Sequence, residues 1–217
     1  MPLRSKDELA KVREARAKRT PLKLAAGGMA PGAIQTIAGI EAHLNSLAHE
    51  LYAKPQANGT LSRAERELLG AVAAGATDCL RGMDTHAACA LELFTAEKRD
   101  GGPLVDAAIT GDFTPLDAKL RALAEMVLSV AAAPAALTQE RIDIVLKAGA
   151  SPTDIVLAMM IACAEGLFSG RMEGMRAPMA ADPENYRPAA RNIVANGYMP
   201  PRPQAPAVVR RQKPPQG

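Results

Sequence analysis

Four places in the sequence carry the same short pattern, in which a serine or threonine is followed three residues later by an acidic residue. The pairs are Ser5 with Glu8, Ser62 with Glu65, Thr114 with Asp117, and Ser151 with Asp154. The pattern is typical of a helix start, because the hydroxyl and the carboxylate each accept a hydrogen bond from a backbone amide that lacks a helical partner. Pro115 and Pro152 stand at the first helical position of the helices that Thr114 and Ser151 are expected to start. These signals predict a chain built of helices.

The spacing of apolar residues supports this fold class. From Pro31 onward, large aliphatic side chains recur every three or four residues, which predicts a core helix that ends at the loop 55–59. Further helices are expected over residues 6–18, 62–76, 80–96, 115–133, 139–148 and 152–172, the first of them highly charged and peripheral. Only 3% of residues are aromatic, whereas strands are enriched in aromatic and β-branched residues. We therefore predict an all-α bundle without strands.

Charge divides the chain into three parts. Residues 1–20 hold seven Lys and Arg against three acids, and residues 200–217 hold four against none. We predict a basic N-terminal extension over 1–29, a helical domain over 30–199 and a Pro-rich, disordered tail over 200–217. Short basic ends are usually solvated, and the scarcity of aromatic rings argues against stacking on nucleic acid bases. No nucleic acid partner is expected.

Other classes of protein are disfavoured by simple features. Three cysteines in 217 residues do not form a disulfide framework, and no apolar stretch follows the charged N-terminus as in a secretory signal. The longest apolar run, from Ile155 to Ala164, is too short to span a bilayer. No glycine loop fits a nucleotide phosphate, and His43 and His49 lie on different helix faces, so neither a cofactor nor a metal is expected. The chain is predicted to be soluble, cytoplasmic and free of membrane.

One group of residues has the composition of a reactive site. Cys79 and His86 are seven residues apart, so one helix would present both on the same face, about 10 Å apart. If the preceding helix folds back as an antiparallel hairpin, the carboxylate of Glu67 reaches His86. Acid, imidazole and thiol can then relay protons. Because Cys79 is expected near a helix start, we predict a lowered pKa for its thiol.

Each residue taken alone has an ordinary structural explanation. A cysteine in an Ala-rich helix is usually a small buried hydrophobe, and Glu67 could be a surface charge beside Arg63 and Arg66. His86 could be a core histidine. Glu165, inside a predicted apolar helix, could face the pocket of His86 or pair with an arginine such as Arg121 or Arg171.

The spacing of the group resembles a known motif. Glu67 within Arg66-Glu67-Leu68, Cys79 and His86 stand in register with the pattern E-x11-C-x-x-C-x3-H of the carboxymuconolactone decarboxylase and alkylhydroperoxidase D family, in its peroxidase-related branch. The resemblance covers roughly residues 30–176. It implies an alkylhydroperoxidase D-like helical bundle that self-associates as a homo-oligomer, and a catalytic site made of Glu67, Cys79 and His86.

The sequence departs from the family motif at one position. Gly82 stands where the family has its second cysteine, the one expected to attack peroxide, so Cys79 matches the resolving cysteine. Cys89 and Cys163 are not expected to replace it, since Cys89 is about 15 Å further along the helix. Arg81 is predicted to bind a substrate anion or to lower the pKa of Cys79.

Three functions are considered from this resemblance and from the glycine that replaces the second cysteine of the motif. The favoured one is a peroxidase-like, antioxidant oxidoreductase that acts on small-molecule peroxides with a thiol reductant, in a form altered by Gly82. The second is a lyase that decarboxylates a small carboxylated lactone, which needs His86 but not Cys79. The third is a non-catalytic scaffold whose basic and Pro-rich ends bind partners.

Overall fold

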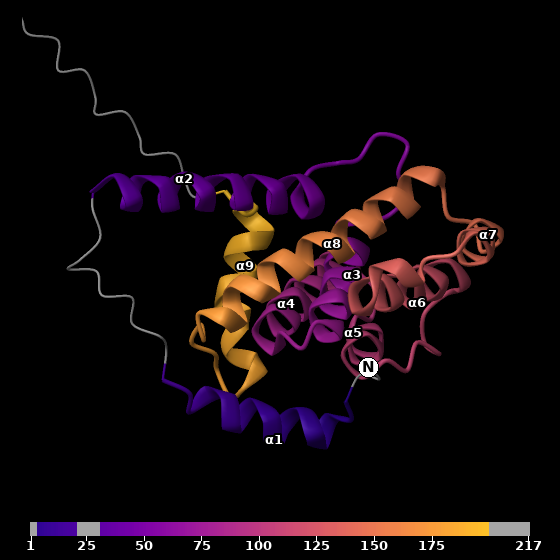
Figure 1. Ribbon diagram of the computed structural model, residues 1–217. Helices are drawn as coiled ribbons and strands as arrows, with labels where there is room; N and C mark the ends of the chain where they lie inside the picture. Colours follow the sequence, from indigo (N-terminus) through magenta and orange to yellow (C-terminus); the bar gives the residue numbers. More distant parts are fainter. Residues whose placement is uncertain (1–3, 21–30, 200–217) are drawn as a thin grey trace, which may run out of the picture.

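The computed structural model describes residues 4–20 and 31–199, with the side chains of 31–37 and of Ala136 left aside. The tail predicted for 200–217 lies outside the described residues. Within them, every regular element is helical (Figure 1), which confirms the all-α prediction. The α-helices are α1 (Lys6–Ala17), α2 (Pro31–Ala48), α3 (Arg63–Ala76), α4 (Leu80–Ala96), α5 (Gly102–Thr110), α6 (Ala118–Ala132), α7 (Gln139–Lys147), α8 (Pro152–Gly174) and α9 (Arg187–Asn196). Shorter turns are the π-helix η2 (His49–Ala53) and the 3₁₀ helices η3 (Pro134–Ala136) and η4 (Pro183–Tyr186).

Three of the four predicted helix starts are confirmed. Both hydrogen bonds of the capping box form at Ser5, Ser62 and Ser151. The prediction at Thr114 was wrong, because Asp117 itself caps α6 by accepting from the amide of Leu120. Thr114 instead bonds through its amide and hydroxyl to Asp112, which ends the preceding turn. The helix therefore begins three residues later than expected.

Two helices were missed from the sequence. The glycine pair before α5 was interpreted as a break, and α9 lies in a region with no recognisable start. Each has a proline in its first turn but lacks a capping box, and neither Gly101 nor Tyr186 makes a side-chain capping hydrogen bond. Their helical state depends on packing, as Ala107 and Ala108 of α5 and Ala190 of α9 are buried.

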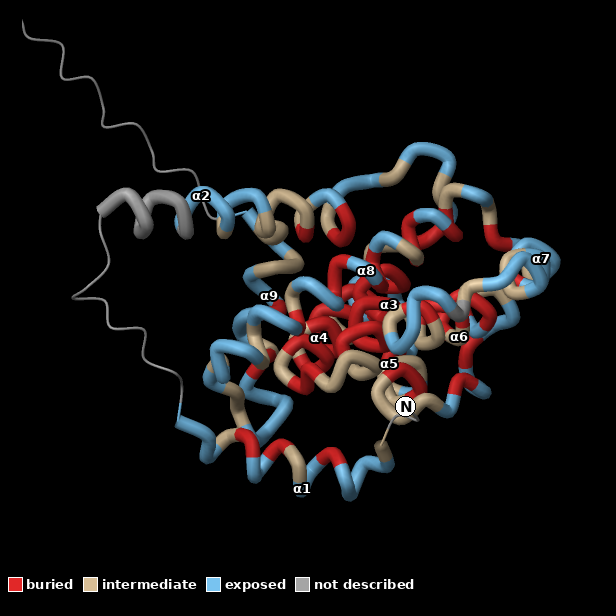
Figure 2. Tube along the Cα trace, viewed as in Figure 1, coloured by how far each residue is buried: buried red, intermediate tan, exposed pale blue. Residues whose placement is uncertain are grey.

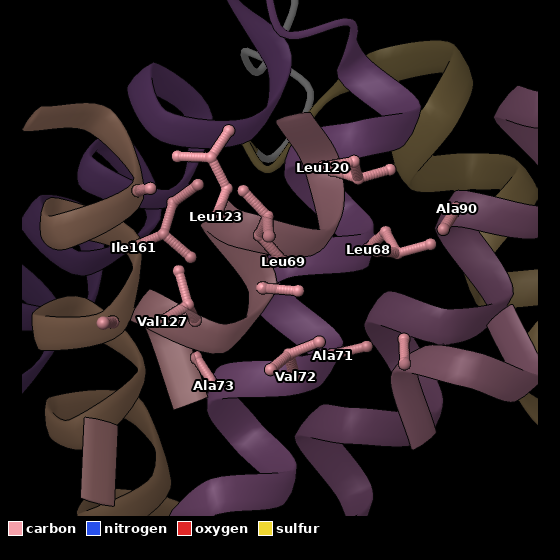
Figure 3. Packing of buried hydrophobic residues seen from close by; sticks show 14 of the residues in the cluster. Leu68, Leu69, Ala71, Val72, Ala73, Ala90, Leu120, Leu123, Val127 and Ile161 are labelled. Carbon is pink, nitrogen blue, oxygen red and sulfur yellow. The ribbon is translucent and has the colours of Figure 1, made fainter. Parts of the chain in front are cut away.

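The core is organised around α3. This helix is buried along most of its length and packs against α4, α6 and α8 (Figure 2). Figure 3 shows its apolar side chains among those of α6 and α8. The labelled residues of this cluster are Leu68, Leu69, Ala71, Val72, Ala73, Ala90, Leu120, Leu123, Val127 and Ile161. Because many are small, the helices approach closely enough for polar side chains to meet between them.

The helix predicted as a core element, α2, is only partly one. Among its described side chains, Ile40 is 55% exposed, and Leu44 and Leu47 are half-buried. The side chains of Ile34 and Ile37 are not among the described ones. The burial begins at Ala48 and continues through η2, where Leu51 and Tyr52 are buried. Only its C-terminal end, with η2, joins the core.

The charged helix α1 lies at the edge of the bundle, as expected, and is held there mainly by arginines (Figure 1). Arg13 makes two hydrogen bonds to the buried carboxylate of Asp84 on α4, at 2.9 and 2.5 Å. Arg16 pairs with Asp78 and also donates to the carbonyl of Asp78. The basic N-terminal segment is thus tied to the corner between α3 and α4.

The helix α8 is long and apolar enough to cross a membrane by length and composition, and 44% of its apolar window is buried. It packs against α3 and α6 and carries the buried acids Asp154 and Glu165, as a core helix does. Its outer face exposes Val156, Met160, Cys163 and Leu167. Exposed apolar patches often mark association surfaces. Self-association, and the cytoplasmic location, stay predictions.

Candidate functional site

A histidine between two carboxylates forms the centre of the site. His86 Nδ1 lies 2.7 Å from Glu67 Oε2, and His86 Nε2 lies 3.1 Å from Glu165 Oε1. All three side chains are buried. The predicted antiparallel hairpin of α3 and α4 is thus present, and it brings Glu67 to His86. Of the two alternatives for Glu165, the structure shows that it faces His86; Arg121 instead bonds to backbone carbonyls and Arg171 pairs with Glu41.

Two tyrosines complete the network, and no sequence pattern singled them out. Tyr52 in η2 donates its hydroxyl to Glu165 Oε1 at 2.8 Å. Tyr198, after α9, donates to Glu67 Oε2 at 2.9 Å. The Tyr52 and His86 rings pack with centroids 4.6 Å apart. Tyrosine is rare in this chain, with three residues in all, and two of the three surround His86.

Several residues hold these elements in place. Arg66, on α3 beside Glu67, donates to the carbonyls of Leu51 and Lys54 at 2.9 and 2.6 Å, which fixes the turn that carries Tyr52. Gly70, one turn further along α3, leaves room for His86: a Cβ there would lie 2.9 Å from Nδ1. A side chain at position 70 would therefore displace the imidazole.

A second anchor joins the two helices that carry the carboxylates. Asp154, in the first turn of α8, accepts hydrogen bonds from the amide and hydroxyl of Thr60 at 2.7 and 2.8 Å. It also accepts from the amide of Leu61 at 3.2 Å. Thr60 and Leu61 precede α3, so this cluster ties the start of α3 to the start of α8. The spacing between Glu67 and Glu165 is set in part by it.

The surroundings of His86 favour its charged form. Burial opposes protonation, but the charge and hydrogen bonds of Glu165, together with those of Glu67, outweigh it and raise the pKa of His86 from 6.5 to about 10. At neutral pH the ring is an imidazolium that donates through both nitrogens. It therefore orients the two carboxylates and is not itself a free base.

This raised pKa predicts how stability depends on pH. Between pH 6.5 and about 10, the folded protein keeps a proton on His86 that the unfolded chain has released. The contribution to the free energy of unfolding is complete below pH 6.5 and is lost as the pH rises toward 10, on the order of a few kcal/mol. Urea unfolding from pH 6.5 to 9.5 measures it. We expect His86→Gln to have a flatter pH dependence than the wild type, while the exposed His43→Gln keeps the wild-type slope; equal slopes for all three proteins would contradict the prediction.

Cys79 lies where the sequence predicted, but its thiol has the opposite character. It is the N-cap residue of α4, next to the positive-φ corner at Asp78. Burial raises its pKa, although the Gly82 amide and the Ser169 hydroxyl act to lower it. The expectation of a lowered pKa was wrong, because the helix terminus that favours the thiolate is itself removed from water.

A small cavity of about 100 Å³ joins the thiol to the histidine network. Its walls come from the end of α2, from η2, α4 and α8, and from Tyr198. Cys79, Gly82, His86 and Glu165 are among its lining residues. A Cβ at Gly82 would lie 3.2 Å from Cys79 Sγ and 3.8 Å from Glu165 Oε2. Because Gly82 has no side chain, the sulfur and this oxygen face the same space.

Arg81 does not have the predicted place in the site. It is absent from the residues that line the cavity, and its guanidinium donates to the carbonyl of Pro178. The arginine on the cavity wall is Arg171, which pairs with Glu41. The position of Arg81, two residues after Cys79, could be read from the sequence, but the direction of its side chain could not.

The other two cysteines do not line the cavity. Cys89 is buried outside the cavity lining, and burial raises its pKa strongly. Cys163 is exposed on the outer face of α8. Among the described residues, no three side chains of His, Cys, Asp and Glu are grouped as ligands for a metal ion.

Comparison with known proteins finds a likeness to solved structures and not to curated sequences. No protein-family model and no curated protein matches the chain. The crystal structure of an uncharacterized peroxidase-related protein from Silicibacter sp. TM1040 is similar to it, with a TM-score of 0.55 and 17% sequence identity. The match covers 78% of this chain and 83% of that chain. It shows a shared helical fold.

Proposed function

We propose that this protein is a thiol-dependent oxidoreductase that reduces small hydroperoxides, with Cys79 as the reacting thiol. The observation that carries the proposal is that Cys79 lines the same cavity as His86 and Glu165, two members of the Glu67–His86–Glu165 network. A nucleophile next to proton-transfer groups is the arrangement that thiol chemistry needs. The likeness to a peroxidase-related protein supports the same class.

The absence of a second cysteine from the motif determines how the oxidised Cys79 is reduced again. The Cys79 thiolate attacks the outer oxygen of the hydroperoxide, so that an S–O bond forms and the O–O bond breaks. The products are a sulfenic acid on Cys79 and, after protonation of the leaving oxygen, an alcohol or water. Because Gly82 cannot supply a resolving thiol, two external thiols must reduce the sulfenic acid, releasing water and a disulfide.

The size and charge of the cavity favour a small, uncharged substrate. An engineered cavity of about 150 Å³ holds benzene, and this one is about 100 Å³. Two carboxylates surround the single imidazole, and the wall arginine is already paired with Glu41. Hydrogen peroxide and short alkyl hydroperoxides fit this description better than a carboxylated lactone, so we place the lyase second.

Trapping of the sulfenic acid tests the proposal directly. We expect one equivalent of hydrogen peroxide, added in the presence of dimedone, to give a dimedone adduct on Cys79, identified by peptide mass spectrometry. Addition of a small thiol should return the free thiol and support repeated turnover. An adduct confined to the exposed Cys163, with Cys79 still reduced, would contradict the proposal. A lyase or a scaffold would likewise leave Cys79 unmodified.

A further inference from the structure

Glu165 is a buried acid that the motif of Glu67, Cys79 and His86 does not include. It stands in the middle of the apolar helix α8, between buried alanines and aliphatic residues, and is 1% exposed. A carboxylate in such a position is costly unless its oxygens are satisfied. Its retention inside a core helix calls for an explanation from its contacts.

The two oxygens of Glu165 have different surroundings. Oε1 accepts from Tyr52 at 2.8 Å and from His86 Nε2 at 3.1 Å. These donors hold the carboxylate in one orientation from two other elements, η2 and α4. Oε2 makes neither of these bonds and points to the space beside Gly82, opposite the sulfur of Cys79. One oxygen is thus fixed by the protein, while the other faces the cavity.

His86 cannot take the role of proton acceptor for the thiol. Both of its ring nitrogens already face carboxylates, Nδ1 toward Glu67 and Nε2 toward Glu165. A proton relay from the thiol through His86 to Glu67 would require one of these contacts to open. The second oxygen of Glu165 makes no bond to His86 or Tyr52, and it faces the same space beside Gly82 as the sulfur.

We infer that Glu165 is a further catalytic residue, which takes the proton from Cys79 through Oε2 and returns it to the leaving oxygen of the peroxide. The inference rests on the proposed function. In the step, the S–H proton moves to the carboxylate as the S–O bond forms and the O–O bond breaks. The carboxylic acid then protonates the alkoxide or hydroxide, so that thiol and hydroperoxide give sulfenic acid and alcohol or water. Positioned acid–base groups typically contribute about 10²- to 10⁴-fold to a rate.

If Glu165 acted only through its negative charge, removing that charge would speed the reactions of Cys79, whereas removing a catalytic acid–base group would slow oxidation. The two roles can therefore be told apart by experiment. The negative charge of Glu165 raises the pKa of Cys79, as does that of Glu173. Glu173 is a matched control, because it lies on the same helix, pairs with Arg16 and Arg19, and is absent from the cavity lining. If Glu165 acted only as a charge, its neutralisation would make Cys79 more reactive in every reaction, as for Glu173.

The experiment compares two reactions of Cys79 in the full-length protein at pH 7. Oxidation by hydrogen peroxide has a leaving group that must be protonated, whereas alkylation by iodoacetamide releases iodide, which needs no proton. We expect Glu165→Gln to slow oxidation by at least about 10-fold and to slow alkylation much less, since alkylation needs the thiol proton removed but no proton on the leaving group. Glu173→Gln is expected to speed both reactions. Glu165→Asp, which keeps the charge but withdraws the oxygens, should also slow oxidation more than alkylation.

The outcomes separate this inference from the proposed function. A parallel change of both reactions in the Glu165 variants, faster or slower, overturns the catalytic role of Glu165. Far-ultraviolet circular dichroism shows which variants are folded, and Glu165→Asp carries the test if Glu165→Gln is not. If Cys79→Ser consumes peroxide as fast as the wild type, the proposed function itself fails, whatever Glu165 does.

Discussion

Replacement of Cys79 by serine is expected to lower the rate constant for peroxide reduction at least about 100-fold, since a serine hydroxyl is a far weaker nucleophile than a thiol. Cys79 is the cysteine on the cavity wall, where it shares the space beside Gly82 with Glu165. The measurement is the initial rate of peroxide loss with excess small thiol. Serine preserves the size of the side chain, so the cavity and the histidine network should remain.

The other two cysteines provide the controls for this prediction. Cys89→Ala and Cys163→Ser are expected to keep the wild-type rate, because one residue is buried outside the cavity lining and the other lies on the outer face of α8. If Cys79→Ser kept its activity while His86→Ala lost it, the chemistry would not use the thiol. Turnover of a carboxylated lactone that is lost in His86→Ala and kept in Cys79→Ser would favour the lyase.

Replacement of Asp84 by asparagine is expected to lower the free energy of unfolding by about 3–5 kcal/mol, because it leaves the Arg13 guanidinium buried without its counter-charge. The side chains of Arg13 and Asp84 are 8% and 1% exposed, and their contact is bidentate. Burial raises the pKa of Asp84 despite Arg13, which shows how much desolvation this pair bears. Urea unfolding followed by circular dichroism measures the change.

An exposed ion pair on the same helix is the matched control. Glu14 and Lys18 are 67% and 73% exposed, and Glu14→Gln should leave the free energy of unfolding close to that of the wild type. The double variant Arg13→Met with Asp84→Met should recover most of the stability lost in Asp84→Asn, because it removes both buried charges. A loss in Asp84→Asn as small as that in Glu14→Gln would show that α1 is not held by this pair.

Local signals in the sequence were enough to predict the helices that carry the motif. The caps at Ser62 and Ser151 placed the starts of α3 and α8, and the spacing of Cys79 and His86 placed both on one side of α4. Glu67 reaches His86 because two adjacent helices joined by a short turn pack antiparallel. Each of these features depends on residues close together in the chain, which is why sequence reasoning found them.

The parts of the site that were not predicted from the sequence depend on contacts between residues that are distant in the chain. Tyr52 and Tyr198 come from a π-helix and from a segment after a helix that has no capping signal, so their directions are set by packing. The raised pKa of Cys79 has the same origin. Its position at a helix start is local information, but the burial that dominates its pKa comes from the neighbouring helices.

The π-helical turn at the end of α2 has a consequence for how such a site could arise. In η2 the amide of Lys54 bonds to the carbonyl of His49, five residues back, so the turn holds one residue more than an α-helical turn. Deletion of one residue before Tyr52 would rotate the ring about 100° around the helix axis, away from Glu165. The contact could therefore be gained or lost through a single-codon insertion or deletion, with no substitution at any residue that lines the cavity.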